Sequence, residues 1–174
     1  MFDNLGNLPL HPLVVHAAVV GIPLAVLLAF LFAFPRTRNW ARWPLAITVV
    51  GAAGVTYVAK QSGLAFEVAL GIRPGNPVGD LILQHSLLAE QLFWIMIVFA
   101  VIGLVNVFVV KGTAGSAEGA VKQPAIVRIV PPILLVAVAV VALIWIVRVG
   151  DLGARAVWNP TAPPLFSLAS KFSS

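Results

Sequence analysis

The sequence predicts an all-α integral membrane protein, in which four transmembrane helices form an up-down bundle with both termini on the extracytoplasmic side. Of its 174 residues, 60% are hydrophobic and only 10% are charged, whereas soluble domains contain roughly 25% charged residues. The apolar residues gather in four stretches of about 20 residues or more, the length that a helix needs to cross a bilayer. We expect one membrane domain over residues 1–158 and a Pro/Ser-rich tail over residues 159–174.

The four predicted spans cover residues 10–34, 43–62, 82–110 and 129–149. Pro23 lies inside the first span, where neighbouring helices can satisfy the carbonyl that it frees. The second span contains the run Gly-Ala-Ala-Gly at 51–54, whose small side chains allow close helix approach. The third is long enough to require a tilt or an extramembrane turn. Pro131 and Pro132 are expected in the first turn of the fourth helix, where proline is well tolerated.

The distribution of positive charge predicts the orientation. The loops at 35–42 and 111–128 lie on one side of the membrane and contain six basic residues: Arg36, Arg38, Arg42, Lys111, Lys122 and Arg128. The opposite side has five basic residues and five acidic ones. Because cytoplasmic loops are enriched in Lys and Arg, both termini are expected outside the cytoplasm.

Polar side chains collect at the predicted outer end of the bundle, although ionisable groups at membrane depth are rare and usually functional. The candidate site residues there are His11, His16, His85, Lys60, Arg148 and Arg155. Interfacial placement explains some of them equally well, because long cationic side chains extend their charged groups to the membrane surface.

Two of these histidines are candidates for axial ligands of haem b. The first and third spans are diagonal in an up-down bundle, and His16 and His85 lie at similar depth, so we expect them to face each other. Haem iron binds histidine readily, and bundle cores commonly hold such sites. The rim cations Lys60, Arg148 and Arg155 would then meet the propionates. This arrangement predicts an electron-transfer or reductase-associated protein.

Two alternatives remain. The first is a histidine metal site for zinc or copper, again with His16 and His85 as ligands; His11 and Glu90 are also chemically suitable. His11 and His16 are five residues apart, about 140° around a helix, so they cannot share one ion unless the helix begins after Pro12. The second alternative is a non-catalytic accessory or scaffold subunit of a larger membrane complex.

Other functional classes receive less support from the sequence. No hydrolase or P-loop motif is present, and enzymatic activity is left open. No basic-aromatic module for nucleic acid is present either. The expected partners are therefore the lipid bilayer and either a membrane protein complex or further copies of the chain.

Four short motifs, taken in order, resemble those of the DUF2231 family of predicted bacterial membrane proteins. They are LHPLVVHAAV, AKQSGLAFEV, HSLLAEQL and GDLGARAVW. The resemblance implies a four-helix protein of the bacterial cytoplasmic membrane, and it implies no particular activity. The positions that it singles out are His11, Pro12, His16, Ser62, Gly63, His85, Gly150, Gly153 and Ala154.

Overall fold

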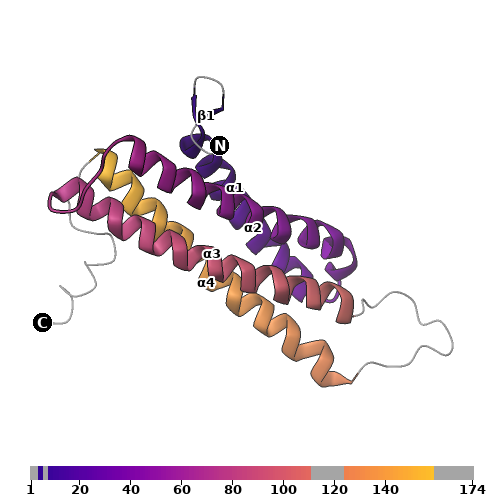
Figure 1. Cartoon of the computed structure of the whole chain (residues 1–174). Coiled ribbons are helices and arrows are strands. Elements are labelled where there is room, and N and C mark those ends of the chain that lie inside the picture. The colour runs from indigo at the N-terminus through magenta and orange to yellow at the C-terminus, as the bar shows by residue number, and fades with distance from the viewer. Residues whose placement is uncertain (1–3, 6–7, 111–123, 159–174) are drawn as a thin grey trace, which may run out of the picture.

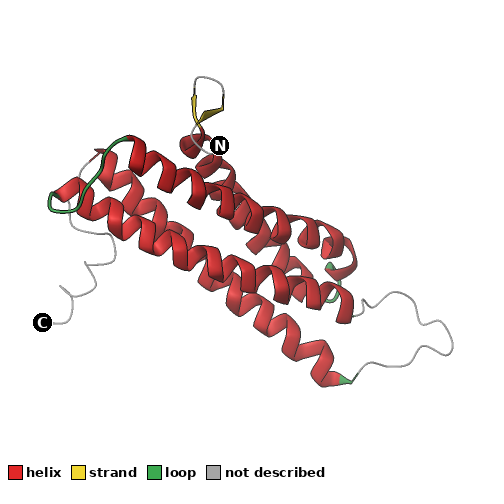
Figure 2. Cartoon of the chain, viewed as in Figure 1, coloured by secondary structure: helices red, strands yellow, loops and turns green. Residues whose placement is uncertain are grey.

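A computed structural model of the chain describes residues 4–5, 8–110 and 124–158. A two-residue antiparallel ladder comes first, formed by β1 (Asn4–Leu5) and β2 (Leu8–Pro9). Four helices follow: α1 (Leu10–Ala33), α2 (Arg38–Ala69), α3 (Pro77–Val109) and α4 (Ala125–Trp158). Figure 2 shows that helices make up almost all of this part of the chain. The predicted tail at 159–174 and most of the second basic loop, at 111–123, lie outside these residues.

The four helices form an up-down bundle. Helix α1 packs against α2 and α4, and α3 packs against the same two helices, so α1 and α3 are diagonal. Figure 1 shows the α1–α2 turn at one end of the bundle, and the α2–α3 connection with the last turn of α4 at the other. All four helices are long and apolar enough to cross a membrane. The predicted all-α, four-span fold is therefore confirmed.

Helices α2, α3 and α4 each begin before the hydrophobic span that the sequence predicts, whereas α1 matches its span closely. Helix α2 has 32 residues, α3 has 33 and α4 has 34. The expectation for Pro131 and Pro132 is wrong, because α4 begins at Ala125 and both prolines lie inside the helix. The φ angle of proline is compatible with a helix, and neighbouring helices in a membrane can satisfy the carbonyl groups that two prolines release.

The bundle interior alternates large and small side chains from all four helices. Its largest fully buried apolar side chains are Ile22, Phe32, Leu45, Met96, Phe99 and Leu135. The small residues let the backbones approach: a Cβ added at Gly103 of α3 would stand 3.2 Å from the Val49 side chain of α2. In the run 51–54, the two alanines are buried, whereas the two glycines are exposed. Only half of that run therefore lies at a helix interface.

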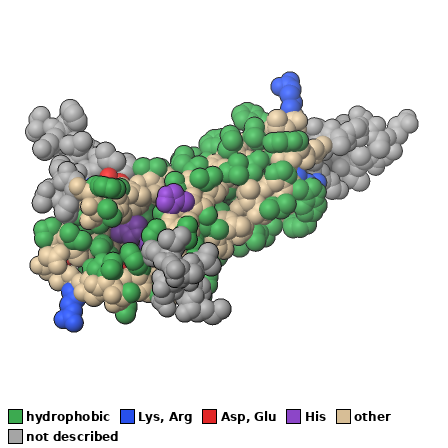
Figure 3. Space-filling model, turned by 90° about the horizontal axis from the view of Figure 1, so that it is seen from above, with side chains coloured by type: hydrophobic (Ala, Val, Ile, Leu, Met, Phe, Trp, Pro, Cys, Tyr) green, Lys and Arg blue, Asp and Glu red, His purple; other side chains and the backbone are tan. Residues whose placement is uncertain are grey.

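The outer surface of the bundle is apolar along its length. Figure 3 shows hydrophobic side chains covering most of the visible face, with Lys and Arg side chains towards its two ends. Exposed leucine and valine side chains occur on every helix, and exposed isoleucines occur on α2 and α4. A surface of this kind indicates contact with lipid, because soluble monomers rarely expose apolar patches larger than a few hundred Å².

Two arginines cap the helices at the end where α1 and α3 finish, which we call the arginine end. Arg38 donates to the carbonyl oxygens of Phe32 (3.1 Å) and Ala33 (3.0 Å) at the end of α1. Arg42 donates to the carbonyl oxygen of Val107 (2.7 Å) and to that of Val110 (3.3 Å), which follows α3. The last carbonyls of a helix lack partners within it and carry partial negative charge, so a guanidinium satisfies both their hydrogen bonding and their electrostatics.

Replacing Arg42 with Gln is expected to destabilise the bundle. The change removes a charge-assisted contact with two carbonyls, each such bond contributing about 1.5–3 kcal/mol. We expect a clear fall in unfolding temperature in detergent, measured by circular dichroism. The matched control is Arg36→Gln, because Arg36 is exposed at the same end. Equal unfolding temperatures for the two variants would show that Arg42 does not stabilise the end of α3.

Candidate functional site

A cavity lies at the opposite end of the bundle, where α1 and α3 begin, which we call the histidine end. Helix α1 has only 24 residues, and its second residue, His11, lies beside Ala59 of α2. Helix α2 continues for ten residues beyond Ala59, to Ala69. Since each residue adds about 1.5 Å, α2 extends roughly 15 Å past the start of α1. The short first helix thus leaves space among the other three.

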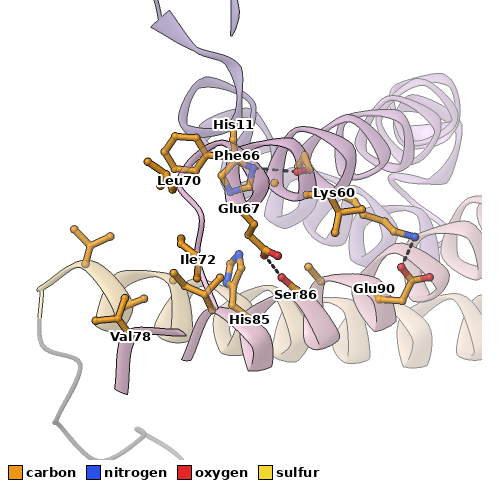
Figure 4. A pocket seen from close by; sticks show the side chains of 18 residues that line it. His11, Lys60, Phe66, Glu67, Leu70, Ile72, Val78, His85, Ser86 and Glu90 are labelled. Carbon is orange, nitrogen blue, oxygen red and sulfur yellow. Dashed lines mark hydrogen bonds and ion pairs between the residues drawn. The ribbon is translucent and has the colours of Figure 1, made fainter. Parts of the chain in front are cut away.

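The cavity has a volume of about 380 Å³, within the roughly 300–1,000 Å³ of small-molecule sites. Aliphatic side chains from α2, α3 and α4 form most of its wall. A small set of polar side chains also lines it: His11, Lys60, Glu67, His85, Ser86 and Glu90. Figure 4 shows His11 and His85 on opposite sides, with Glu67 between them. A mostly apolar pocket with a few convergent polar groups is typical of ligand-binding sites.

A backbone carbonyl of α2 holds the ring of His11. Its Nδ1 lies 3.0 Å from the carbonyl oxygen of Ala59 and 3.3 Å from Oγ of Ser62. The Ser62 hydroxyl, which is buried, donates to the same carbonyl at 3.1 Å. The ring also stacks on Phe66, with the two centroids 6.1 Å apart. Both polar and apolar contacts therefore orient this imidazole.

His85 is held in the same way by α4. Its Nδ1 lies 2.9 Å from the carbonyl oxygen of Val149. A carbonyl oxygen can only accept, so in both histidines the proton must be on Nδ1 when the ring is neutral. The remaining nitrogen, Nε2, then carries a lone pair in each ring.

Glycine makes both contacts possible. Gly63 follows Ala59 by four residues and Gly153 follows Val149 by four residues. In a helix the Cβ atom points towards the N-terminus, so a side chain at position i+4 covers the carbonyl of residue i. A Cβ added at Gly63 would stand 3.1 Å from Cε1 of His11, and one at Gly153 would stand 3.1 Å from Cε1 of His85. The two hairpins, α1–α2 and α3–α4, thus repeat one arrangement of histidine, carbonyl and glycine.

The two imidazoles meet across the bundle diagonal. Their ring centroids are 6.4 Å apart and their planes are nearly perpendicular, at 87°. His11 comes from the start of α1, and His85 comes from the ninth residue of α3. Their contact brings together two helices that do not otherwise pack closely.

Other charged and polar groups of the cavity are paired across helices. The Glu67 carboxylate accepts a hydrogen bond from the Ser86 hydroxyl, joining α2 to α3. Lys60 forms an ion pair with Glu90, and its ammonium lies 5.1 Å from the centroid of the Phe93 ring. These contacts satisfy groups that would be costly to leave unpaired in an apolar wall.

The structure divides the sequence-predicted residues into two groups. His11, His85 and Lys60 line the cavity, as do Gly63 and Gly153.

His16 is exposed, and its Nδ1 lies 2.6 Å from the carbonyl oxygen of Pro12. The expected facing of His16 and His85 is therefore wrong. The reason is angular: at five residues' separation His16 lies on a different face of α1 from His11.

The remaining predicted cations lie elsewhere on α4. Arg148 stands over the Trp145 ring, 5.2 Å from its centroid, and lines a separate groove with Gln84, Gln91 and Asp151. Arg155 is half-buried and is not part of the cavity wall.

Phe66, Glu67 and Ser86 are among the cavity residues that the sequence did not predict as site residues. A helical-face argument identifies Glu67, because it follows Lys60 by seven residues, two turns along the same face of α2. Ser86 follows His85 directly in the chain, and no sequence pattern of its own identifies it as a site residue.

Alanine at either histidine-facing glycine is expected to lower stability, whereas alanine at a nearby glycine is not. Gly153→Ala and Gly63→Ala crowd the rings, and such overpacking typically costs about 1–3 kcal/mol. Gly150 of α4 and Gly54 of α2 have no atom within 4 Å of an added Cβ. Their alanine variants should gain helix propensity, about 0.5–1 kcal/mol. Unfolding temperatures in detergent for the pairs Gly153→Ala/Gly150→Ala and Gly63→Ala/Gly54→Ala check this, and equal values within a pair would contradict it.

Comparison with known proteins identifies a family for the chain. The family described as "Predicted membrane protein (DUF2231)" matches residues 7–161, which include all four helices and the whole cavity. No curated protein and no solved structure matches at a significant level. The match covers far more than half of the chain, and the chain therefore belongs to the DUF2231 family.

Proposed function

We propose that this protein binds haem b between His11 and His85 and acts in electron transfer or in a reductase assembly. The observation that carries the proposal is the meeting of these two imidazoles across the diagonal, 6.4 Å between centroids, with each Nδ1 directed to a helix carbonyl. His11 takes the position that the sequence suggested for His16.

The separation of the two rings would allow both imidazoles to bind one iron. Imidazoles that bind one ion from opposite sides, at metal–nitrogen distances of about 2.0–2.1 Å, have centroids roughly 6–6.5 Å apart. Histidine ligands almost always donate their other ring N–H to a carbonyl, a carboxylate or water, which fixes the tautomer and the ring orientation. Both histidines already have that second partner.

The number of protein donors favours haem over an ion held by the protein alone. A structural or catalytic zinc site uses three or four protein ligands. In the part of the chain that the structure describes, no group of three or more His, Cys, Asp or Glu side chains is placed to hold a metal. A porphyrin supplies four of the six iron ligands itself, so two histidines suffice.

The chain's own residues would prepare the site for such a group. Bound haem supplies a one-electron couple whose potential depends on axial ligands, burial and nearby charge. The aliphatic wall excludes water, while the Lys60–Glu90 pair holds opposite charges at the edge of the cavity. Figure 4 shows the Glu67 carboxylate beside the two rings, hydrogen-bonded to Ser86, where it would stabilise positive charge.

The absorption spectrum of the purified protein, before and after dithionite, tests the haem proposal. Expressed with haem available, the wild type should show a Soret band and sharpened bands on reduction. His11→Ala and His85→Ala should each remove most of the haem, because each deletes an axial ligand. His16→Ala is the matched control and should retain it, since His16 is exposed outside the cavity.

Two outcomes would overturn the proposal. Loss of haem in His16→Ala with retention in His11→Ala would contradict the ligand assignment. A colourless wild-type protein would exclude haem and favour the accessory-subunit alternative, in which the apolar helices hold a larger complex or further copies of the chain. Co-purification of such a partner with the histidine variants would support that alternative.

We also propose that the protein resides in a bacterial cytoplasmic membrane with its histidine end outside. The asymmetry of Lys and Arg between the two sides supports this orientation. It is tested with single cysteines, because the chain has none of its own.

An impermeant thiol reagent applied to intact cells should label Ser173→Cys, beyond the end of α4. It should not label Ser116→Cys, between α3 and α4, until the cells are permeabilised, because the basic loops are held inside. Labelling of Ser116→Cys in intact cells, with Ser173→Cys protected, would reverse the orientation.

A further inference from the structure

A second cavity lies at the arginine end, far from the histidines. It has a volume of about 380 Å³ and is lined by the end of α1, the start of α2 and the first turns of α4. Its wall includes two cationic side chains, Arg38 and Arg128, and no acidic side chain from the described residues. The two guanidinium groups repel each other electrostatically. A bound anion would offset this repulsion, because it would attract both guanidinium groups.

The two arginines differ in their freedom to bind an external group. Arg38 is buried and donates through Nε and Nη2 to the carbonyls of Phe32 and Ala33, so its position is fixed. Arg128 is exposed near the start of α4, where the helix dipole also favours negative charge. Together they place one fixed and one exposed guanidinium in the wall of the groove.

The rest of the groove is apolar and follows the axis of α4. Ile129, Ile133 and Val136 line it at intervals of four and three residues, which places them on one face of the helix. Ile129 and Ile133 are 55% and 60% exposed, so this face is open to the bilayer. A charged mouth leading into an apolar track, parallel to a spanning helix, matches the shape of a phospholipid.

We propose that this groove binds one anionic phospholipid, with its phosphate between Arg38 and Arg128 and an acyl chain along Ile129, Ile133 and Val136. Basic pockets between spanning helices are a known mode of anionic headgroup recognition. The site is independent of the histidine end, so its occupancy does not depend on the proposed haem.

Native mass spectrometry of the full chain, with added phosphatidylglycerol or phosphatidylcholine, tests the proposal. The wild type should retain one phosphatidylglycerol in preference to phosphatidylcholine. Arg128→Gln should lower the affinity for phosphatidylglycerol about fivefold, the effect of one basic charge near an anionic surface. The matched control is Arg36→Gln, which removes an exposed charge at the same end from outside the groove and should bind as the wild type does.

A second variant tests the apolar track. Ile133→Trp should fill it and lower phosphatidylglycerol occupancy, with the unfolding temperature in detergent unchanged because position 133 faces lipid. Equal losses in Arg36→Gln and Arg128→Gln would overturn the proposal in favour of diffuse surface attraction. The proposal would also be overturned if inorganic phosphate competed as strongly as phosphatidylglycerol, because the apolar track would then contribute nothing to the affinity. Unchanged occupancy in Ile133→Trp would exclude the acyl-chain contact.

Discussion

The structure depends on satisfying backbone carbonyl groups in a medium that offers no water. In lipid, each unpaired carbonyl or side-chain donor costs free energy, so polar side chains of a spanning bundle must find partners within the protein. Here many of the long-range polar contacts are made to backbone oxygens, by His11, His85 and Arg42. Asn106 of α3 likewise donates to the carbonyl oxygen of Pro131 in α4. These contacts join helices that apolar packing alone would leave free to slide, because lipid tails solvate leucine as well as a neighbouring helix does.

The two ends of the bundle use carbonyls of different kinds. At the arginine end the acceptors lie at helix C-termini, where partial negative charge suits a guanidinium. At the histidine end the acceptors, Ala59 and Val149, lie well inside their helices and are already engaged in the helical hydrogen-bond pattern. Only a donor that approaches closely can share such an oxygen, which is why a glycine must stand four residues later. A planar imidazole fits that gap, and its second nitrogen remains available.

Hydropathy was sufficient to predict the four-helix fold, because the thickness of the bilayer sets the length of an apolar span. Hydropathy did not show which of His11 and His16 faces His85. Depth along the helix, estimated by counting from the span ends, favoured His16. Direction around the helix instead places His11 in the cavity with His85 and leaves His16 exposed. Direction depends on where α1 begins and how it rotates against α2, and both follow from packing. The resemblance singles out Gly63 and Gly153, but the sequence does not give the reason, because each glycine uncovers a carbonyl of its own helix for a histidine of the neighbouring helix. The pairing of Glu67 with Ser86 depends on how α2 and α3 are aligned.

Each histidine is anchored within its own hairpin: His11 of α1 is bound to α2, and His85 of α3 is bound to α4. No helix carries both anchors, so the gap between the rings is a gap between two half-bundles. A small displacement of one hairpin against the other therefore changes the separation of the rings by a similar amount, without breaking either anchoring hydrogen bond. A group that bridges the imidazoles would therefore hold the two hairpins together. A force that moves one hairpin against the other would then act directly on the bonds between that group and the histidines.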